Sequence, residues 1–279
     1  MGDEDSLITK LTISDQLQFK LNRLKEVITE MGQVLIAYSG GVDSTVLLKI
    51  AHEVLGSNAQ AAIVNSESFP QRELNQATEI AKNIGIILHY SEIKESDNIN
   101  IISNPPDRCY HCKTGLFSHL KTVACDLGIS YVLDGTIADD LHDYRPGLKA
   151  KEEIGIQSPL ADCNFSKNEI RQLAQVFDLP NWNKPSFACL NSRIPYGEVI
   201  SEEKLSQIDD AENYLLGLGF SQVRVRHHSD LARIEVLSED FREVLIHKEK
   251  ISEFLKKSGF LYVTLDLVGY RTGSMNESL

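Results

Sequence analysis

A Ser-Gly-Gly-Val-Asp-Ser segment that begins at Ser39 has residue types that suit the binding of a phosphate chain. Gly40 and Gly41 allow a tight turn whose N–H groups can face an anion. The helix that we expect directly after them adds further free N–H groups and a favourable dipole. Ser39 and Ser44 add hydroxyl donors, and Asp43 can hold Mg²⁺ on the phosphates. The segment therefore predicts a phosphate-binding loop, and an ordinary strand-to-helix turn is the alternative.

The five cysteines are the second group of residues that could do chemistry. Cys109 and Cys112 stand in a Cys-x-x-Cys pattern, a spacing at which two thiolates readily share one metal centre. The odd number argues against a set of structural disulfides and favours metal binding or thiol chemistry. An inert or zinc-bound pair is the alternative. We expect Cys125, within a predicted helix, to be a buried small residue, and Cys163 is left without a role.

Basic residues in three later segments could bind the anionic parts of a substrate: Arg145, Lys149, Arg193, Arg224 and Arg226. Arg224 and Arg226 lie two residues apart on a predicted strand, so both side chains share a face and can grip one anion. The alternative for this pair is a solvated strand face paired to Glu235 or Asp230. For Arg145 and Lys149 the alternative is ordinary surface charge.

The elements that must position these residues alternate between strands and helices. Strands are predicted at 33–38, 61–65, 86–90 and 131–135, and helices at 15–31, 45–51, 73–84 and 113–127. This order predicts a parallel α/β sheet with crossover helices. Ligands of such sheets bind beyond the carboxyl ends of the strands. Ser66 and Gly135 each follow a strand, so we expect them on the same side as the phosphate-binding loop.

From about residue 200 onwards the pattern changes. A helix, two alternating strands, a second helix and a last strand are predicted at 201–216, 222–227, 232–236, 242–258 and 262–267. This order predicts a small α+β domain. We therefore expect two domains, residues 1–200 and residues 201–279.

Composition and charge restrict the possible functions. The chain has 279 residues, 42% of them hydrophobic, which is enough for a sizeable core. No apolar run approaches the ~20 residues of a membrane helix, and the acidic N-terminus lacks the features of a secretory signal, so we expect a cytoplasmic protein. The net charge of −12 argues against broad binding of nucleic acid.

With a strand before it and a helix after it, the Ser-Gly-Gly-x-Asp-Ser string resembles the signature of the PP-loop ATP pyrophosphatases. The resemblance implies a Rossmann-like fold of the adenine nucleotide alpha-hydrolase type. It also implies that ATP is split between its α and β phosphates, which leaves an adenylylated acceptor. The lysine of a Walker loop is absent here. ATP contacts are then expected from Ser39, Gly40, Gly41, Asp43, Ser44, Ser66 and Gly135.

Six further blocks resemble the LarE family over nearly the whole chain: NSESF (65–69), VLDG (132–135), DYRPGLKA (143–150), SRIPYG (192–197), VRVRH (223–227) and VTLDL (263–267). That family consists of ATP-dependent sulfur transferases that make the nickel-pincer nucleotide, the cofactor of lactate racemase. The resemblance implies pyridinium-3,5-biscarboxylic acid mononucleotide as the substrate, whose carboxylates become thiocarboxylates. It implies a homo-oligomer, a trimer or hexamer, and a functional link to the other proteins of that pathway. Its anion site is implied at residues Ser192, Arg193, Glu212, Arg224 and Arg226, with Arg145 and Lys149 as further contacts.

The same resemblance leaves two sources for the sulfur and places the reactive thiol at Cys189. In the catalytic version, Cys109, Cys112 and Cys189 hold a [4Fe–4S] cluster whose open iron carries a transferable sulfide. In the sacrificial version, Cys189 gives up its own sulfur and becomes dehydroalanine. The Cys-x-x-Cys pair favours the cluster, because the sacrificial members lack that pair and a structural zinc site prefers four protein ligands.

Two other functions fit parts of the sequence. A tRNA-thiolation enzyme of the same fold normally has a broad basic surface, which the net charge of −12 does not offer. A non-catalytic ATP-binding or iron–sulfur sensor would release no pyrophosphate when it is offered a carboxylate acceptor.

Overall fold

The structure is a computed structural model that describes residues 13–142, 146–185, 188–271 and 273–275. The chain divides into two compact units. The first comprises Met1–Val64, Arg72–Ser91 and Leu116–Ser186, and the second comprises Asn65–Gln71, Glu92–Gly115 and Phe187–Leu279. The expected division into 1–200 and 201–279 stays a prediction. Within the described residues, no helix is both long and apolar enough to span a bilayer.

A four-stranded sheet with the order β3-β2-β1-β4 forms the centre of the first unit. Its strands are β1 (Val34–Ala37), β2 (Ala59–Asn65), β3 (Ile87–Glu92) and β4 (Tyr131–Leu133). β1 pairs in parallel with both β2 and β4. Val34, Leu35 and Ile36 are fully buried, as their apolar run predicts for a strand covered on both faces. The parallel α/β sheet expected from the sequence is confirmed.

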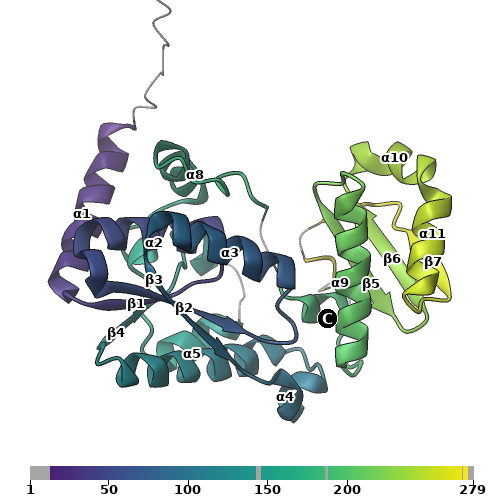
Figure 1. The fold of residues 1–279 in the computed structure, drawn as a ribbon, viewed down its shortest axis with the longest axis horizontal. Coiled ribbons are helices and arrows are strands. Elements are labelled where there is room, and N and C mark those ends of the chain that lie inside the picture. The colour runs from purple at the N-terminus through teal and green to yellow at the C-terminus, as the bar shows by residue number, and fades with distance from the viewer. Residues whose placement is uncertain (1–12, 143–145, 186–187, 272, 276–279) are drawn as a thin grey trace, which may run out of the picture. The chain divides into compact units, whose positions relative to one another are not determined.

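Helices cover both faces of this sheet. α2 (Val42–Leu55) and α3 (Gln71–Ile84) run along one side, and α5 (Arg108–Asp126) runs along the other (Figure 1). α1 (Asp15–Met31) begins after the N-cap Ser14 and buries a stripe at helical spacing, formed by Leu17, Leu21, Leu24 and Ile28. The unit also contains η1 (Gly56–Asn58), η3 (Ala138–His142), α6 (Pro146–Ile154), α7 (Pro159–Asp162) and α8 (Lys167–Val176).

α5 begins at Arg108, whereas the sequence predicts a helix only from residue 113. The run from Arg108 to Lys113 has no apolar periodicity, which is why its helical state is hard to predict. Because the helix starts early, Cys109 and Cys112 lie three residues apart on its first turns and share one face. The Cys-x-x-Cys pair is therefore part of a helix and not of a loop.

A three-stranded sheet with the order β5-β6-β7 lies in the C-terminal part of the second unit. β5 (Val223–His228) and β6 (Leu231–Val236) are antiparallel, and β7 (Tyr262–Leu265) is parallel to β6. The unit also contains η2 (Glu95–Asp97), α4 (Ile99–Ile102), η4 (Leu190–Arg193), α9 (Glu202–Gly217), η5 (Ser238–Asp240), α10 (Phe241–Ile246) and α11 (Lys248–Lys257). Leu215, Val225, Ile234 and Leu255 lie in its core. The expected second, smaller sheet is therefore present.

Candidate active site

The phosphate loop joins β1 to α2, and two glycines determine its shape. Gly40 has a φ of 71°, in the left-handed region that favours glycine, and a Cβ added there would lie 2.7 Å from the Cβ of Ala77. Gly41 is the N-cap of α2 and has an extended backbone. The first turn of α2 thus offers N–H groups that have no partner inside the helix, which is the arrangement that binds phosphate.

Hydrogen bonds hold this loop in place without any ligand. The hydroxyls of Ser39 and Ser44 lie 3.1 Å apart. Behind the loop, the side-chain amide of Asn181 donates to the Gly40 carbonyl at 3.1 Å and to the Thr45 hydroxyl at 2.9 Å. Asn181 is 1% exposed, so these bonds are shielded from water. The loop is therefore preorganised, which lowers the cost of ordering it on a nucleotide.

The turn after β4 packs directly against the loop. A Cβ added at Gly135 would lie 2.7 Å from the backbone nitrogen of Ser44. Asp134 fixes this turn from below, because its carboxylate accepts from the Ser158 hydroxyl at 2.6 Å. The buried Lys151 amine in turn donates to the Ser158 hydroxyl at 2.6 Å. The structure thus brings Gly135 and Ser44 together, as the sequence predicts for two strand ends of one sheet.

Asp43 is bound by a lysine that the sequence analysis does not single out. The Lys167 amine donates to both carboxylate oxygens of Asp43, at 2.8 and 2.7 Å. Burial raises the pKa of Asp43, and the charge of Lys167 opposes that rise. Lys167 is the first residue of α8, where Ser166 and Glu169 form a capping box. That Ser-x-x-Glu pattern is the sequence signal that could have located the helix start and hence the lysine.

Three further residues are predicted from the sequence to contact ATP or an anion: Ser66, Lys149 and Arg145. Ser66 belongs to the second unit, where its hydroxyl lies 3.4 Å from a carboxylate oxygen of Glu95. Lys149 is exposed on α6, with its amine 3.8 Å from Glu153. Arg145 lies outside the described residues.

In the second unit Cys109 and Cys189 lie beside Arg108, and Cys112 is near Cys189. The Arg108 side chain is 2% exposed, and one of its nitrogens lies 3.7 Å from the Cys109 sulfur. It also donates to the Asn191 carbonyl at 3.1 Å. Burial acts to lower the pKa of Arg108, but Cys189 and Cys109 raise it above its ordinary value. A buried guanidinium beside sulfur is the surrounding that stabilises thiolates.

Cys112 faces a carboxylate instead of a cation. Its thiol donates to Glu95 Oε1 at 3.1 Å. Burial raises the pKa of Cys112, and the charges of Glu95 and Cys189 raise it further. Burial also raises the pKa of Cys189, while Arg108 opposes that rise.

The predicted metal ligands do not form a ready-made metal site. Among the described residues, no three His, Cys, Asp or Glu side chains are arranged to hold a metal ion. The role of Cys109, Cys112 and Cys189 as cluster ligands therefore stays a prediction. The expectation for Cys125 is wrong: it lies on the outer side of α5 and is exposed, whereas Cys163 is buried.

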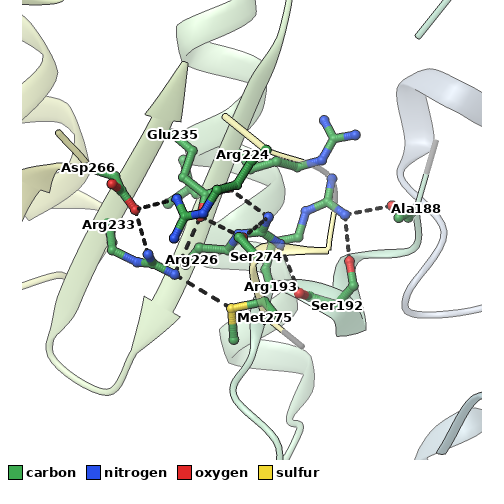
Figure 2. Close-up of polar contacts among 12 residues, drawn as sticks. Ala188, Ser192, Arg193, Arg224, Arg226, Arg233, Glu235, Asp266, Ser274 and Met275 are labelled. Carbon is green, nitrogen blue, oxygen red and sulfur yellow. Dashed lines mark hydrogen bonds and ion pairs between the residues drawn. The ribbon is translucent and has the colours of Figure 1, made fainter. Parts of the chain in front are cut away.

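Arg193 fixes the loop that carries Cys189. Its fully buried guanidinium forms an ion pair with Glu212, with N–O distances of 2.9 and 3.1 Å. The remaining nitrogen donates to the carbonyls of Ala188 at 2.7 Å and of Cys189 at 3.0 Å. Figure 2 shows Arg193 extended between Ser192 and Ala188. Arg193 therefore acts on the position of Cys189 through the backbone of its loop.

Arg224 and Arg226 differ in their contacts and in their burial. Arg226 is buried and donates to Glu235 at 2.7 Å and to the Ser192 carbonyl at 3.0 Å, so the pairing with Glu235 that the sequence leaves as the alternative is present (Figure 2). Arg224 is half-buried and lies over the Tyr270 ring at 5.4 Å. Burial, together with the charges of Arg193 and Arg226, lowers the pKa of Arg224 to about 10. Such crowding of positive charge favours the binding of an anion.

Comparison with known proteins adds independent information. Residues 16–106, which include the phosphate loop, match the family model of NAD synthase. An uncharacterized protein of Synechocystis is 46% identical over 94% of this chain and 99% of its own length. The pyridinium-3,5-bisthiocarboxylic acid mononucleotide synthase of Lactiplantibacillus plantarum is 40% identical over 94% of this chain and 96% of its own length. A component of the glutamine-hydrolyzing GMP synthase of Pyrococcus furiosus is 26% identical over 59% of this chain and 55% of its own length.

The similarity to the Lactiplantibacillus synthase runs through both units, and the phosphate loop lies within the stretch that matches NAD synthase. ATP is therefore the nucleotide that this loop uses. The chain belongs to the LarE family of ATP-dependent sulfurtransferases, which are built on the PP-loop ATP pyrophosphatase fold.

Proposed function

We propose that this chain adenylylates a carboxylate of pyridinium-3,5-biscarboxylic acid mononucleotide and converts it to a thiocarboxylate. The observation that carries this proposal is the 40% identity to the Lactiplantibacillus synthase over nearly the full length of both chains. A carboxylate is a poor acyl donor until its oxygen attacks the α-phosphorus of ATP. The acyl adenylate then forms as pyrophosphate leaves, and sulfur later displaces AMP from the acyl carbon.

The phosphate loop supports the first of these steps. Backbone N–H groups from Gly40 to Ser44 bind the β and γ phosphates, so that the leaving pyrophosphate is held as its charge grows. Asp43 would supply a carboxylate ligand for Mg²⁺, and the ion would offset negative charge on the phosphates. Lys167 donates to both oxygens of Asp43, and its charge opposes the rise in the pKa of Asp43 that burial causes. The same amine is a cation within reach of any phosphate that is bound through Asp43.

The arginine group of the second unit supports the binding of the substrate's own phosphate. Arg224 is the member that we assign to direct contact, because crowding by Arg193 and Arg226 favours an anion beside it. Arg226 and Arg193 are held by Glu235 and Glu212, and they keep the group rigid. Ser192 links this group to the cysteine loop, since its hydroxyl donates to the Cys189 carbonyl at 2.8 Å.

Cys109, Cys112 and Cys189 would hold a [4Fe–4S] cluster, and when bound this cluster supplies the sulfide that is transferred. The support is the shared neighbourhood of the three thiols and the buried Arg108 beside two of them. Anaerobic reconstitution followed by iron and sulfide analysis tests the assignment. We expect Cys109→Ser and Cys112→Ser to lose the iron, and Cys125→Ser, on the exposed side of the same helix, to keep it.

Turnover with ATP and the biscarboxylate tests the proposed function directly. We expect pyrophosphate release that depends on the acceptor, a thiocarboxylate product and an intact protein mass. Asp43→Ala should stop pyrophosphate release, because Mg²⁺ loses its carboxylate. A protein mass that drops by the elements of hydrogen sulfide at Cys189 would replace the cluster with the sacrificial route. Release of pyrophosphate without any thiocarboxylate would contradict the function itself.

A further inference from the structure

Asn181 is a buried residue of the turn after α8, and its side-chain oxygen makes no bond within the protein. The residue is 1% exposed, and among the described residues its Oδ1 has no hydrogen-bond partner. An unpaired oxygen in the interior costs free energy, because it has lost its bonds to water. An apolar side chain of similar size would avoid that cost. Stability alone therefore does not explain an amide at this position, and the use of the amide must lie in its nitrogen.

The nitrogen of this amide uses both of its hydrogens on the phosphate loop and its helix. It donates to the Gly40 carbonyl at 3.1 Å and to the Thr45 hydroxyl at 2.9 Å. The Thr45 hydroxyl in turn donates to the Gly41 carbonyl at 2.8 Å. All of these residues belong to the first unit. The carbonyls of two successive glycines are thus held, one by the amide directly and one through Thr45.

A held carbonyl also fixes the direction of the N–H group in the same peptide. The peptides after Gly40 and Gly41 are trans and planar, so the N–H of each points away from its C=O. With the Gly40 carbonyl held on the side of the amide, the Gly41 N–H faces the other side, where it lies 3.4 Å from the Ser39 hydroxyl. Holding the Gly41 carbonyl directs the N–H of Val42 in the same way. Val42 is the first residue of α2, where the helix itself provides no partner for an N–H.

We propose that Asn181 is a positioning residue that aims two backbone N–H groups, those of Gly41 and Val42, at the β and γ phosphates of ATP. This inference rests on the role that the proposed function gives to the phosphate loop. Without the amide the two glycine carbonyls can turn, because glycine allows many backbone conformations. The N–H groups must then be ordered when the phosphates bind, and this cost weakens the affinity. AMP lacks these two phosphates, so its affinity does not depend on Asn181.

The experiment measures the binding of ATP, inorganic pyrophosphate and AMP to the full-length protein by calorimetry in the presence of Mg²⁺. Asn181→Leu removes the amide, and Thr45→Val removes only the hydroxyl that holds the second carbonyl. We expect each to weaken the binding of ATP and pyrophosphate about tenfold, as for the loss of one hydrogen bond, and to leave the affinity for AMP unchanged. Thr45→Ser keeps the hydroxyl and should recover most of the affinity. Thr78→Val is the matched control, because the Thr78 hydroxyl donates to the Leu74 carbonyl, also four residues earlier, on α3.

A merely structural role predicts a different pattern. A destabilised variant would lose binding sites for all three ligands in the same proportion, and the affinities of its folded molecules would not change. Equal affinities for pyrophosphate in the wild type and in Asn181→Leu overturn the inference, and so does a parallel loss of affinity for AMP. If Asn181→Leu does not fold, the pair Thr45→Val and Thr45→Ser decides the question.

The wild type separates this inference from the proposed function. A wild type that binds neither ATP nor pyrophosphate overturns both. A wild type that binds both ligands but makes no thiocarboxylate contradicts the proposed function alone, because the variants still test how the loop holds the phosphates.

Discussion

Replacing Gly135 with alanine should slow pyrophosphate release, because this glycine packs on the start of the phosphate-binding helix. An added Cβ would lie 2.7 Å from the Ser44 nitrogen and 2.9 Å from its Cα. Both are backbone atoms, so no side chain can rotate to relieve the contact. Widening the gap from 2.7 Å to the 3.4 Å of ordinary contact moves the two segments apart by about 0.7 Å.

That displacement acts on a nitrogen that we assign to phosphate binding. A misplacement of about 1 Å costs roughly a hundredfold in rate, so we expect kcat/KM to fall by about tenfold to a hundredfold. This loss corresponds to roughly 1.4–2.8 kcal/mol of transition-state stabilisation. The overpacked site should also lower the free energy of unfolding by about 1–3 kcal/mol.

A continuous pyrophosphate assay at saturating acceptor, together with urea denaturation, measures both effects. Gly115→Ala is the matched control, because a Cβ at this position in α5 meets nothing within 4 Å and alanine favours the helix. We expect the control to keep its activity and to be at least as stable as the wild type. Unchanged kinetics in Gly135→Ala would refute the idea that the turn after β4 supports the phosphate loop.

Three further substitutions test the other contacts. Lys167→Met should lower the rate of pyrophosphate release by about a hundredfold. It should also move the acid limb of the kcat/KM profile to higher pH, because Lys167 no longer opposes the burial that raises the pKa of Asp43. An acid limb at the same pH as in the wild type would argue against this pairing. Arg193→Met should cost about 3–5 kcal/mol in urea unfolding, because Glu212 stays buried without its cation. Burial acts to raise the pKa of Glu212, but Arg193 holds it below its ordinary value. The pair therefore stabilises the folded wild type fully above the ordinary Glu pKa, and this stabilisation is lost as the pH falls through the lowered pKa. A variant as stable as the wild type would contradict the role of the pair. Arg224→Gln should raise the KM of the mononucleotide by about tenfold to a hundredfold and leave the KM of ATP unchanged; equal KM values for the mononucleotide would remove Arg224 from the substrate site.

The fold of the first unit is largely predictable from the sequence. Its strands are short apolar runs, such as Val34–Ala37, and the glycines after the first strand mark the turn into a helix. The start of α5 is not predictable in this way, because the residues from Arg108 to Lys113 carry no apolar periodicity of a helix. Its tertiary surroundings, and not local preference, decide that it is helical.

The candidate site is predictable only in part, for a physical reason. Motifs identify the residue types, and strand geometry places Gly135 near Ser44. Pairing partners far away in the sequence leave no local signal, so the bonds from Lys167 to Asp43 and from Cys112 to Glu95 appear only in the folded chain. The sequence also cannot say which arginine is used internally, since that depends on acids on other elements.

The contact between Gly40 and Ala77 links the residue choices at two distant positions. Position 77 lies on α3 and needs no contact with the nucleotide, yet any side chain larger than a methyl group there would reach the space that Gly40 leaves. A larger side chain at position 77 would displace Gly40 and the phosphate loop, and it would weaken the affinity for ATP. A mutational survey restricted to residues that touch ATP would therefore overlook a position that controls how tightly ATP is held.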